Sequence, residues 1–304
     1  MKVLSFGSMN VDHVYRVPHP VRSGETLAAT DYRVFPGGKG LNQSIALARA
    51  GMEVWQAGRL GPQGLFLKAL LEENGVHTDF IELCQEPNGH AVIQVEPDGQ
   101  NSIFLFGGTN RSVTVEQMEK TLRHFEAGDV IVCQNEINGM ETLTEMAAEK
   151  GLRLALNPSP MDGFVTRDIV GRASWVYVNE TEAQALTGVP ADDLERMACA
   201  LLQYSSRPEW ILTLGGSGAC SIRQGEETLR QGVFQVRAVD TTAAGDTFSG
   251  FHLAAVLQGM SRREALRRGA LAAALAVSRS GASSSIPTRE ELSACRFTEM
   301  AFGA

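Results

Sequence analysis

The sequence lacks the common signatures of nucleotide-binding and hydrolytic proteins. No G-x-x-x-x-G-K-[ST] segment occurs, and the first apolar run, residues 3–7, is followed by Ser8-Met9-Asn10 rather than by G-x-G-x-x-G. Neither a P-loop nor a dinucleotide-binding turn is present, which counts against a Rossmann oxidoreductase. The motifs H-E-x-x-H and G-x-S-x-G are missing as well, which excludes the simplest zinc-protease and serine-hydrolase mechanisms.

Cysteine pairs, long apolar runs and a positive net charge are also missing. The five cysteines are odd in number and form no C-x-x-C pair, which is typical of buried thiols in a reducing cytoplasm. The most apolar window, residues 269–277, is too short to span a bilayer, and no export signal is recognised. A net charge of −8 with a pI near 5.4 argues against a nucleic-acid or anionic-membrane partner. We expect a cytoplasmic protein with small-molecule ligands.

What the chain does contain is an alternation of strand-like and helix-like segments. With 304 residues, of which 43% are hydrophobic, it is long enough for one large α/β domain or two smaller ones. Such alternation indicates a mostly parallel sheet with helices on both faces. The predicted strands of this sheet are residues 3–7, 130–133, 152–156, 175–178 and 211–214, and the predicted helices are residues 140–149, 182–186, 246–258 and 262–279.

Two separated parts of the chain are typical of strand pairs that stand outside this sheet. Residues 11–17 and 26–35 mix β-branched, aromatic and polar side chains on either side of a turn. Residues 90–96 and 102–106 flank Pro97-Asp98-Gly99 in the same way. We predict a small β lid built from segments of about 11–36 and 88–107, with a glycine-rich hinge at residues 37–40.

Residues 239–250, VDTTAAGDTFSG, form the most informative stretch. Apolar Phe234, Val236 and Val239 predict a strand before it, and a helical pattern begins at Asp246. A helix start attracts anions such as phosphate because its first N–H groups have no internal partner. Small residues before Asp246 leave room for a ligand. Asp246 itself is either a general base or simply the N-cap of the helix.

A second set of polar residues suits a polyol. Asn10 and Asp12 are two apart, so on a strand they point to one face and could hold neighbouring hydroxyls, unless they form a turn. Lys39 and Asn42 lie three apart at a helix start and would face the same pocket, although Lys39 could equally be a solvated surface lysine. Glu136 follows a buried strand, at the sheet edge where ligands gather.

A third set follows later strands. Asn179 and Glu182 have the spacing of a capping box that opens the next helix. Residues 213–218, TLGGSG, form a glycine-rich turn, which by itself is weak evidence for a ligand. Asn179, Gly215 and Asp246 would all fall at the carboxyl ends of strands.

Four segments together carry a resemblance to a known family. They are GSMNVDH at residues 7–13, PGGKGLNQ at 36–43, NETE at 179–182 and DTTAAGDTF at 240–248. In this order, over nearly the whole chain, they resemble the ribokinase-like (PfkB) carbohydrate kinases. The resemblance implies one kinase domain over residues 1–304, with a Rossmann-like sheet and a small β lid. It also implies ATP-dependent phosphorylation of a primary sugar hydroxyl, most simply the 5-hydroxyl of D-ribose, and a homodimer formed through the lid.

The resemblance also implies the site residues. Asp246 becomes the catalytic base, and Ala243, Ala244 and Gly245 form an anion hole for the transferred phosphoryl group. Mg²⁺ accompanies ATP near Asn179 and Glu182, and a K⁺ ion activates the enzyme. The residues implied for the sugar are Met9, Asn10, Val11, Asp12, Gly38, Lys39, Gly40, Asn42, Glu136 and Asp246. Those for ATP are Asn179, Glu182, Thr213, Leu214, Gly215, Gly216, Ser217, Gly218, Gly245, Asp246 and Ala270, where Ala270 replaces the His or Asn common against adenine. Those for K⁺ are Asp240, Thr242, Ala276, Arg279, Gly281 and Ser285, mostly through backbone oxygens.

Alternative functions remain open at this point. A kinase of the same family could act on deoxyribose, another sugar or a nucleoside. Asn10, Asp12 and the GGKGLN segment favour a free pentose, and no arginine cluster is evident for a substrate phosphate. A catalytically silent sugar-binding regulator is a further alternative, although Asp246 and the anion turn are intact.

Overall fold

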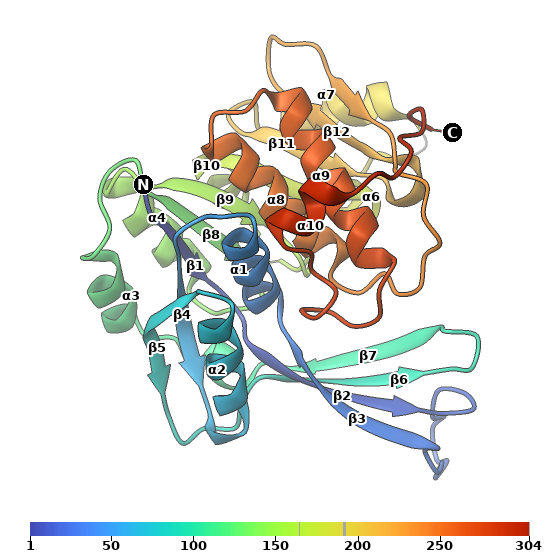
Figure 1. Cartoon of the computed structure of the whole chain (residues 1–304). Coiled ribbons are helices and arrows are strands. Elements are labelled where there is room, and N and C mark those ends of the chain that lie inside the picture. Colours follow the sequence, from blue (N-terminus) through green and yellow to red (C-terminus); the bar gives the residue numbers. More distant parts are fainter. Residues whose placement is uncertain (164, 191–192, 304) are drawn as a thin grey trace.

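Two β-sheets of unequal size organise the chain (Figure 1). The computed structural model describes residues 1–163, 165–190 and 193–303. Within them the large sheet has the order β13-β12-β11-β10-β9-β8-β1-β4-β5, and the small sheet has the order β3-β2-β6-β7. The strands of the large sheet are β1 (Val3–Phe6), β4 (Val54–Leu60), β5 (His77–Leu83), β8 (Val130–Gln134), β9 (Arg153–Asn157), β10 (Ala173–Asn179), β11 (Glu209–Thr213), β12 (Ala219–Ile222) and β13 (Leu229–Gln231).

The central strands are buried on both faces. All pairings from β5 across to β11 are parallel, and the β11–β12 and β12–β13 pairings at one edge are antiparallel. In strand β8, successive side chains point to opposite faces of the sheet, and both faces are covered. Val130 and Val132 point into one hydrophobic cluster, whereas Ile131 and Cys133 point into the other. A strand covered by helices on both sides is therefore a nearly continuous apolar run, which in β8 ends at Gln134.

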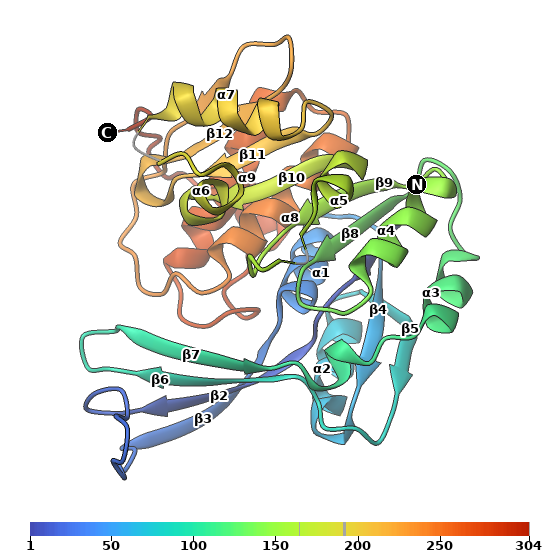
Figure 2. The same ribbon diagram turned by 180° about the vertical axis from the view of Figure 1, so that it is seen from behind.

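Helices cover both faces of the large sheet, as Figures 1 and 2 show from opposite sides. The two hydrophobic clusters lie on these two faces. The predicted fold class, a mostly parallel α/β sheet flanked by helices with a small additional sheet, is therefore confirmed. On one face lie α1 (Lys39–Arg49), α2 (Leu65–Glu73), α8 (Ala244–Leu257), α9 (Arg262–Val277) and α10 (Arg289–Ala294), and on the other α3 (Val115–Leu122), α4 (Met140–Glu149), α5 (Arg167–Arg172), α6 (Glu180–Thr187) and α7 (Leu194–Tyr204).

Helices α1 and α8 approach each other unusually closely. A Cβ atom on Gly250 of α8 would lie 2.5 Å from the Cβ of Ala46 on α1, so only glycine fits at this crossing. Small residues on both helices let the backbones meet. The first turns of α1 and α8 are thereby placed side by side, and hydrogen bonds join their side chains.

The small sheet combines the two predicted strand pairs. Strands β2 (Asn10–Arg16) and β3 (Asp31–Gly37) are antiparallel, as are β6 (His90–Val95) and β7 (Asn101–Phe106). Strand β2 pairs with β6 in parallel and joins the two hairpins into one sheet. This sheet projects away from the helical layers (Figures 1 and 2).

The strand predicted through Phe234, Val236 and Val239 is wrong. Phe234 makes only an isolated bridge with Glu299, and Val239 is 61% exposed. The N–H of Val239 donates to the carbonyl oxygen of Val277 (2.7 Å), so this segment is tied to the end of α9 instead of to a strand. The strand predicted over residues 26–35 is also shorter than expected, since β3 begins only at Asp31.

No helix in the described part of the chain is long and apolar enough to cross a membrane.

Candidate active site

The candidate site lies where the order of strands across the large sheet reverses. Strands β4 and β5 extend from β1 to one side, and β8 pairs with β1 on the other. Parallel sheets bind ligands outside the carboxyl ends of their strands at such a switch point. Residues 8–10 leave β1 at this position and Glu136 follows β8. Several of the residues implied for the sugar therefore belong to neighbouring strand ends.

Asp246 lies in the first turn of α8 and is 9% exposed. Its Oδ2 atom accepts a hydrogen bond from Asn42 Nδ2 (3.1 Å), and its Oδ1 atom accepts one from Gln43 Nε2 (2.9 Å). The N-cap position belongs to Ala243, and no side chain caps this helix, so the N-cap interpretation of Asp246 is wrong. The carboxylate faces α1 instead, where a substrate hydroxyl could reach it.

The turn before α8 has an unusual backbone conformation. Ala243 has a φ of 59°, the one positive value at a non-glycine residue in the described ranges. The N–H of Ala244 donates to the carbonyl oxygen of Thr241 (3.2 Å), so this amide is engaged within the turn. The N–H groups of Gly245 and Asp246 belong to the first helical turn, where helix geometry provides no acceptor. The turn therefore directs backbone donors outward, and its role as an anion hole stays a prediction.

Lys39 supplies positive charge to the pocket from the first position of α1. Burial acts to lower the pKa of Lys39, but three carboxylates outweigh this effect and raise that pKa above its usual value. In order of effect, these carboxylates belong to Asp246, Glu136 and Glu182. Glu136 Oε2 also accepts hydrogen bonds from the Lys39 N–H (3.2 Å) and from Ser8 Oγ. The lysine is therefore half-buried among carboxylates that favour its charged form, and its contact with a sugar stays a prediction.

Strand β2 carries Asn10 and Asp12, which confirms the strand interpretation over a turn. A Cβ on Gly37, in the paired strand, would collide with the Asp12 carboxylate, so glycine there leaves the space that the carboxylate fills. Burial and, after it, the charge of Glu136 raise the pKa of Asp12 to about 7. Asp12 therefore changes charge near neutral pH.

Asn110, which the sequence did not single out, orients Asn10. The Oδ1 atom of Asn110 accepts from the N–H of Met9 (3.1 Å), so its Nδ2 atom must face Asn10 and donates to Asn10 Oδ1 (2.6 Å). Asn10 then has its own NH₂ group left for a ligand. The candidate site thus has a hydrogen-bond donor at Asn10 and an acceptor at Asp12, two residues apart on β2. No local pattern in the sequence marks Asn110, because it lies 100 residues from its partner.

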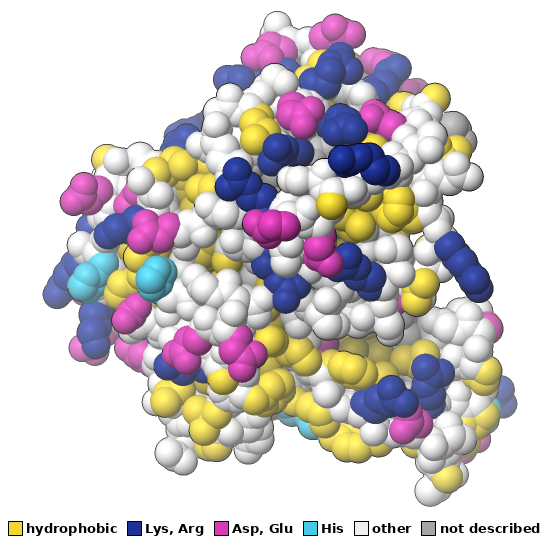
Figure 3. Space-filling model, viewed as in Figure 1, with side chains coloured by type: hydrophobic (Ala, Val, Ile, Leu, Met, Phe, Trp, Pro, Cys, Tyr) yellow, Lys and Arg dark blue, Asp and Glu magenta, His cyan; other side chains and the backbone are white. Residues whose placement is uncertain are grey.

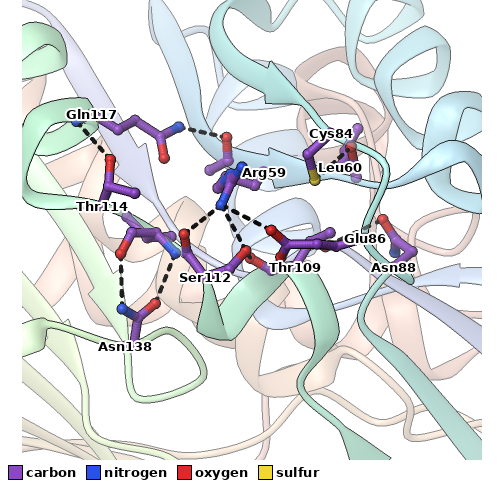
Figure 4. Close-up of polar contacts among 12 residues, drawn as sticks. Arg59, Leu60, Cys84, Glu86, Asn88, Thr109, Ser112, Thr114, Gln117 and Asn138 are labelled. Atoms are coloured by element: carbon purple, nitrogen blue, oxygen red, sulfur yellow. Dashed lines mark hydrogen bonds and ion pairs between the residues drawn. The ribbon is translucent and has the colours of Figure 1, made fainter.

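Polar contacts pin the base of the small sheet to β4 (Figure 4). Arg59 Nη1 donates to the carbonyl oxygen (2.6 Å) and to Oγ (2.9 Å) of Ser112, and it forms an ion pair with Glu86 (3.5 Å). Asn88 Nδ2 donates to the carbonyl oxygen of Met9 (3.1 Å). The chain entering β6 and the chain leaving β7 are thus both fixed to the large sheet, close to where β2 begins.

The residues implied for ATP include those at the carboxyl ends of β10 and β11. Asn179 and Thr213 are register partners across this strand pair. Asn179 and Glu182 form a capping box, with Asn179 Oδ1 accepting from the Glu182 N–H (2.9 Å) and Glu182 Oε2 accepting from the Asn179 N–H (3.0 Å). The capping interpretation is therefore confirmed. The turn Gly215–Ser217 follows β11 and is exposed, and Ala270 is half-buried on α9.

Asp240 ties the segment before α8 to the segment after α9. Its Oδ1 atom accepts from the N–H (2.9 Å) and Oγ1 (2.6 Å) of Thr242, and its Oδ2 atom accepts from the N–H of Gly281 (2.9 Å). Burial acts to raise the pKa of Asp240, but these hydrogen bonds outweigh it and hold that pKa below its usual value. An ionised carboxylate thus joins the two segments implied for the cation. The remaining residues implied there lie at or after the end of α9 and are Ala276, Arg279 and Ser285.

Comparison with known proteins gives one consistent result. Residues 1–289 match the pfkB family of carbohydrate kinases. A ribokinase of Haemophilus influenzae is 37% identical over 292 residues, which cover 94% of this chain and 95% of that protein. A deoxyribokinase of Salmonella typhi is 29% identical over 299 residues, covering 96% of this chain and 97% of that protein.

A solved structure extends the comparison to the fold. The structure of Arabidopsis thaliana ribokinase complexed with ribose and ATP matches with a TM-score of 0.86 and 30% identity, covering 96% of this chain and 97% of that one. The chain belongs to the pfkB family of carbohydrate kinases. The resemblance of the four motifs is confirmed.

Proposed function

We infer that the protein is an ATP-dependent kinase that phosphorylates the primary (5-) hydroxyl of a free pentose, with D-ribose as its first substrate. The observation that carries this inference is the position of Asp246. Its carboxylate is buried at the start of α8, acts on the charge of Lys39, and lies close in the chain to the backbone N–H groups of the turn before α8. The ribokinase relative at 37% identity and the similarity to a ribokinase bound to ribose and ATP support ribose and ATP as substrates.

The reaction follows from these positions. Asn10 donates to the sugar, and Asp12 accepts from one of its hydroxyls. Asp246 takes the proton of the primary hydroxyl, whose oxygen attacks the γ-phosphorus of ATP while ADP leaves. The N–H groups at the start of α8 hold the charge on the transferred phosphoryl group. Lys39 offsets the charge of the surrounding carboxylates, so the phosphate groups can approach them.

Magnesium fits the nucleotide side of the site. Asn179 and Glu182 provide oxygen atoms beside the start of α6, and Mg²⁺ prefers oxygen ligands and retains much of its water shell. These two residues would hold the hydrated ion. When bound, Mg²⁺ offsets negative charge on the ATP phosphates.

The small sheet has the position expected of a lid. In this proposal residues 1–304 form one kinase domain, and the lid consists of segments of about 11–36 and 88–107. Its base is pinned at Arg59 and Asn88, and Gly38, with a φ of 96°, links β3 to α1. Closure over the sugar would exclude water, which otherwise competes for the phosphoryl group.

A panel of sugars tests the proposed function. With ATP and Mg²⁺, ADP release should be fastest with D-ribose, then with deoxyribose, and slow with hexoses and nucleosides. The deoxyribokinase relative makes deoxyribose the second candidate. A nucleoside turned over far better than both pentoses would move the protein elsewhere in the family. Sugar binding without any ADP release would favour a silent regulator.

Activation by K⁺ is the next expected result. The Asp240 carboxylate and the backbone carbonyls after α9 are a donor set that suits a weakly hydrated monovalent cation. A bound ion would fix the turn that carries Ala243 and so orient its N–H groups. We expect K⁺ to raise kcat well above the value in Na⁺. The assay exchanges K⁺ for Na⁺ or a bulky organic cation at constant ionic strength, and equal rates in all three would eliminate the site.

A homodimer through the lid is also part of this proposal. Hydrophobic side chains gather over the small sheet (Figure 3). They include Tyr32 (49% exposed) and Phe104 (59% exposed), and β3 and β7 are the edge strands of this sheet. Such edges and apolar surfaces favour pairing with a second copy. Phe104→Glu should convert a dimer to a monomer in sedimentation, whereas Phe66→Glu on α2 should not. A wild-type protein that sediments as a monomer at micromolar concentration would contradict the proposal.

A cytoplasmic location remains the expected one. All five cysteines are free thiols, and Cys133 and Cys220 are buried. Reduced thiols suit a reducing compartment.

A further inference from the structure

A chain of buried amides ends at the carboxylate of Asp246. Gln134, at the end of β8, donates from Nε2 to Gln43 Oε1 (2.7 Å), and Gln43 Nε2 donates to Asp246 Oδ1 (2.9 Å). Gln134 is fully buried and Gln43 is 2% exposed. Neither glutamine is among the residues implied for sugar, nucleotide or cation. Their contacts nevertheless lead directly to the proposed base.

The chemistry of the groups fixes the direction of this chain. An ionised carboxylate can only accept hydrogen bonds, so the amide of Gln43 must turn its NH₂ group toward Asp246 and its oxygen toward Gln134. Gln134 must then present its NH₂ group to Gln43. Its own Oε1 atom is left buried without a partner among the described residues. That atom lies against Gly7, where a Cβ would collide with it, so a glycine directly after β1 leaves the space for this arrangement.

The second oxygen of Asp246 has a different environment. Oδ2 accepts from Asn42 Nδ2 at 3.1 Å, a longer contact, and Asn42 Oδ1 is buried without a partner in the described residues. Asn42 thus has an acceptor left over, whereas Gln43 has both amide atoms engaged. An incoming hydroxyl can therefore replace the contact at Oδ2 more readily than the contact at Oδ1.

We propose that Gln43, oriented by Gln134, is a positioning residue that holds Oδ1 of Asp246 and leaves Oδ2 to take the proton of the sugar hydroxyl. The sugar oxygen then forms the new bond to the γ-phosphorus, the bond from that phosphorus to the leaving oxygen of ADP breaks, and the proton stays on Oδ2. In this arrangement Gln43 acts only through Asp246 and is assigned no contact with the sugar or ATP. This inference rests on the proposed role of Asp246 as the base.

Substitution by leucine, which has a similar size and no hydrogen-bonding groups, tests the proposal. Gln43→Leu should lower kcat by roughly tenfold, since a hydrogen bond to a charged group is lost, while the sugar KM stays within about twofold. Gln134→Leu should lower kcat less, by about threefold, because Gln43 remains but is less well oriented. Gln117→Leu is the matched control. Gln117 is also 2% exposed, donates to the Gly58 carbonyl oxygen (2.8 Å) and has an unpartnered Oε1, but it lies on α3 (Figure 4).

The pH profile of kcat separates positioning from a general packing defect. A hydrogen bond donated to a carboxylate favours its ionised form. Gln43→Leu should therefore need a higher pH to reach its full kcat, whereas Gln117→Leu should keep the wild-type profile. The other titratable groups that share the pocket are Lys39 on α1, Asp12 on β2, Glu136 after β8 and Glu182 on α6, and all of them are kept in these variants.

A double variant makes the test independent of absolute rates. Because Gln134 acts through Gln43, Gln43→Leu/Gln134→Leu should be no slower than Gln43→Leu alone. Multiplicative losses in the double variant, or a Gln43→Leu kcat and pH profile equal to wild type, would overturn the proposal. So would an equal loss in Gln117→Leu. If Gln43→Leu does not fold, as its melting temperature would reveal, the pH profile of Gln134→Leu decides. Normal turnover in Asp246→Asn would instead show that Asp246 is not the base, and the proposed mechanism itself would then fail.

Discussion

Asp246→Asn is expected to lower kcat by about 10²–10⁴-fold, the usual range for loss of a general base. Asparagine keeps the shape of the side chain, and its carbonyl oxygen can still accept from Gln43 or Asn42. Sugar and ATP should therefore still bind, with dissociation constants close to those of the wild type. Steady-state ADP release and calorimetric titration of both substrates measure the two quantities.

Asp193→Asn provides the control for this substitution. Asp193 also accepts a hydrogen bond at a helix start, from the N–H of Arg196 (3.0 Å), but it caps α7 and lies outside the pocket. Asparagine is an equally good N-cap, so activity should be unchanged. Near-normal turnover in Asp246→Asn would mean that another group removes the proton.

Asp12→Ala is expected to raise the sugar KM by about 10–100-fold and to change kcat much less, because in the proposed mechanism Asp12 accepts from the sugar in the ground state and the transition state alike. The wild-type KM should also depend on pH. The pKa of Asp12 is raised to about 7, so in the free enzyme the carboxyl group of Asp12 is mostly protonated below pH 7. A hydroxyl donates better to the ionised form, and the KM for the sugar should fall as the pH rises through 7.

The isosteric variant Asp12→Asn separates charge from shape. It should lose the dependence of the sugar KM on pH around 7, because no ionisable group is left at this position. Asp31→Asn in the neighbouring strand β3 is the control, since Asp31 pairs with exposed Arg33 (3.0 Å). If the ATP KM moved and the sugar KM did not, Asp12 would belong to a different part of the site.

The sequence predicted the layers of the fold because buried parallel strands and amphipathic helices leave different periodicities. Strand β8 is apolar up to its final residue, Gln134, for the reason seen in the structure, namely burial on both faces. The same logic failed at Phe234 and Val236, where spaced apolar residues pack a loop against the hydrophobic cluster that contains α8 and α9. Alternation reports which side chains are buried, and it does not report whether the backbone finds a strand partner.

The candidate site was predictable to the extent that its residues belong to recognised motifs. Asn42 and Asp246 were found in this way, and Gln43 was passed over although it stands next to Asn42 in the same motif. Its importance depends on which amide atom faces the carboxylate, and a sequence contains no such information. Asn110 and Gln134 were missed because their partners lie 100 and 91 residues away in the chain.

The contact between Ala46 and Gly250 bears on how natural variants of this protein are judged. Neither residue is among those assigned to a substrate, yet their lack of bulk sets the spacing between the helix that carries Asn42 and the helix that carries Asp246. A valine at position 250 would force these helices apart and misplace Asp246, the proposed base, without removing any group of the site. A ranking of variants by their distance from the ligands would class this change as harmless. The close packing of Gly250 against Ala46 instead leads us to expect a loss of activity.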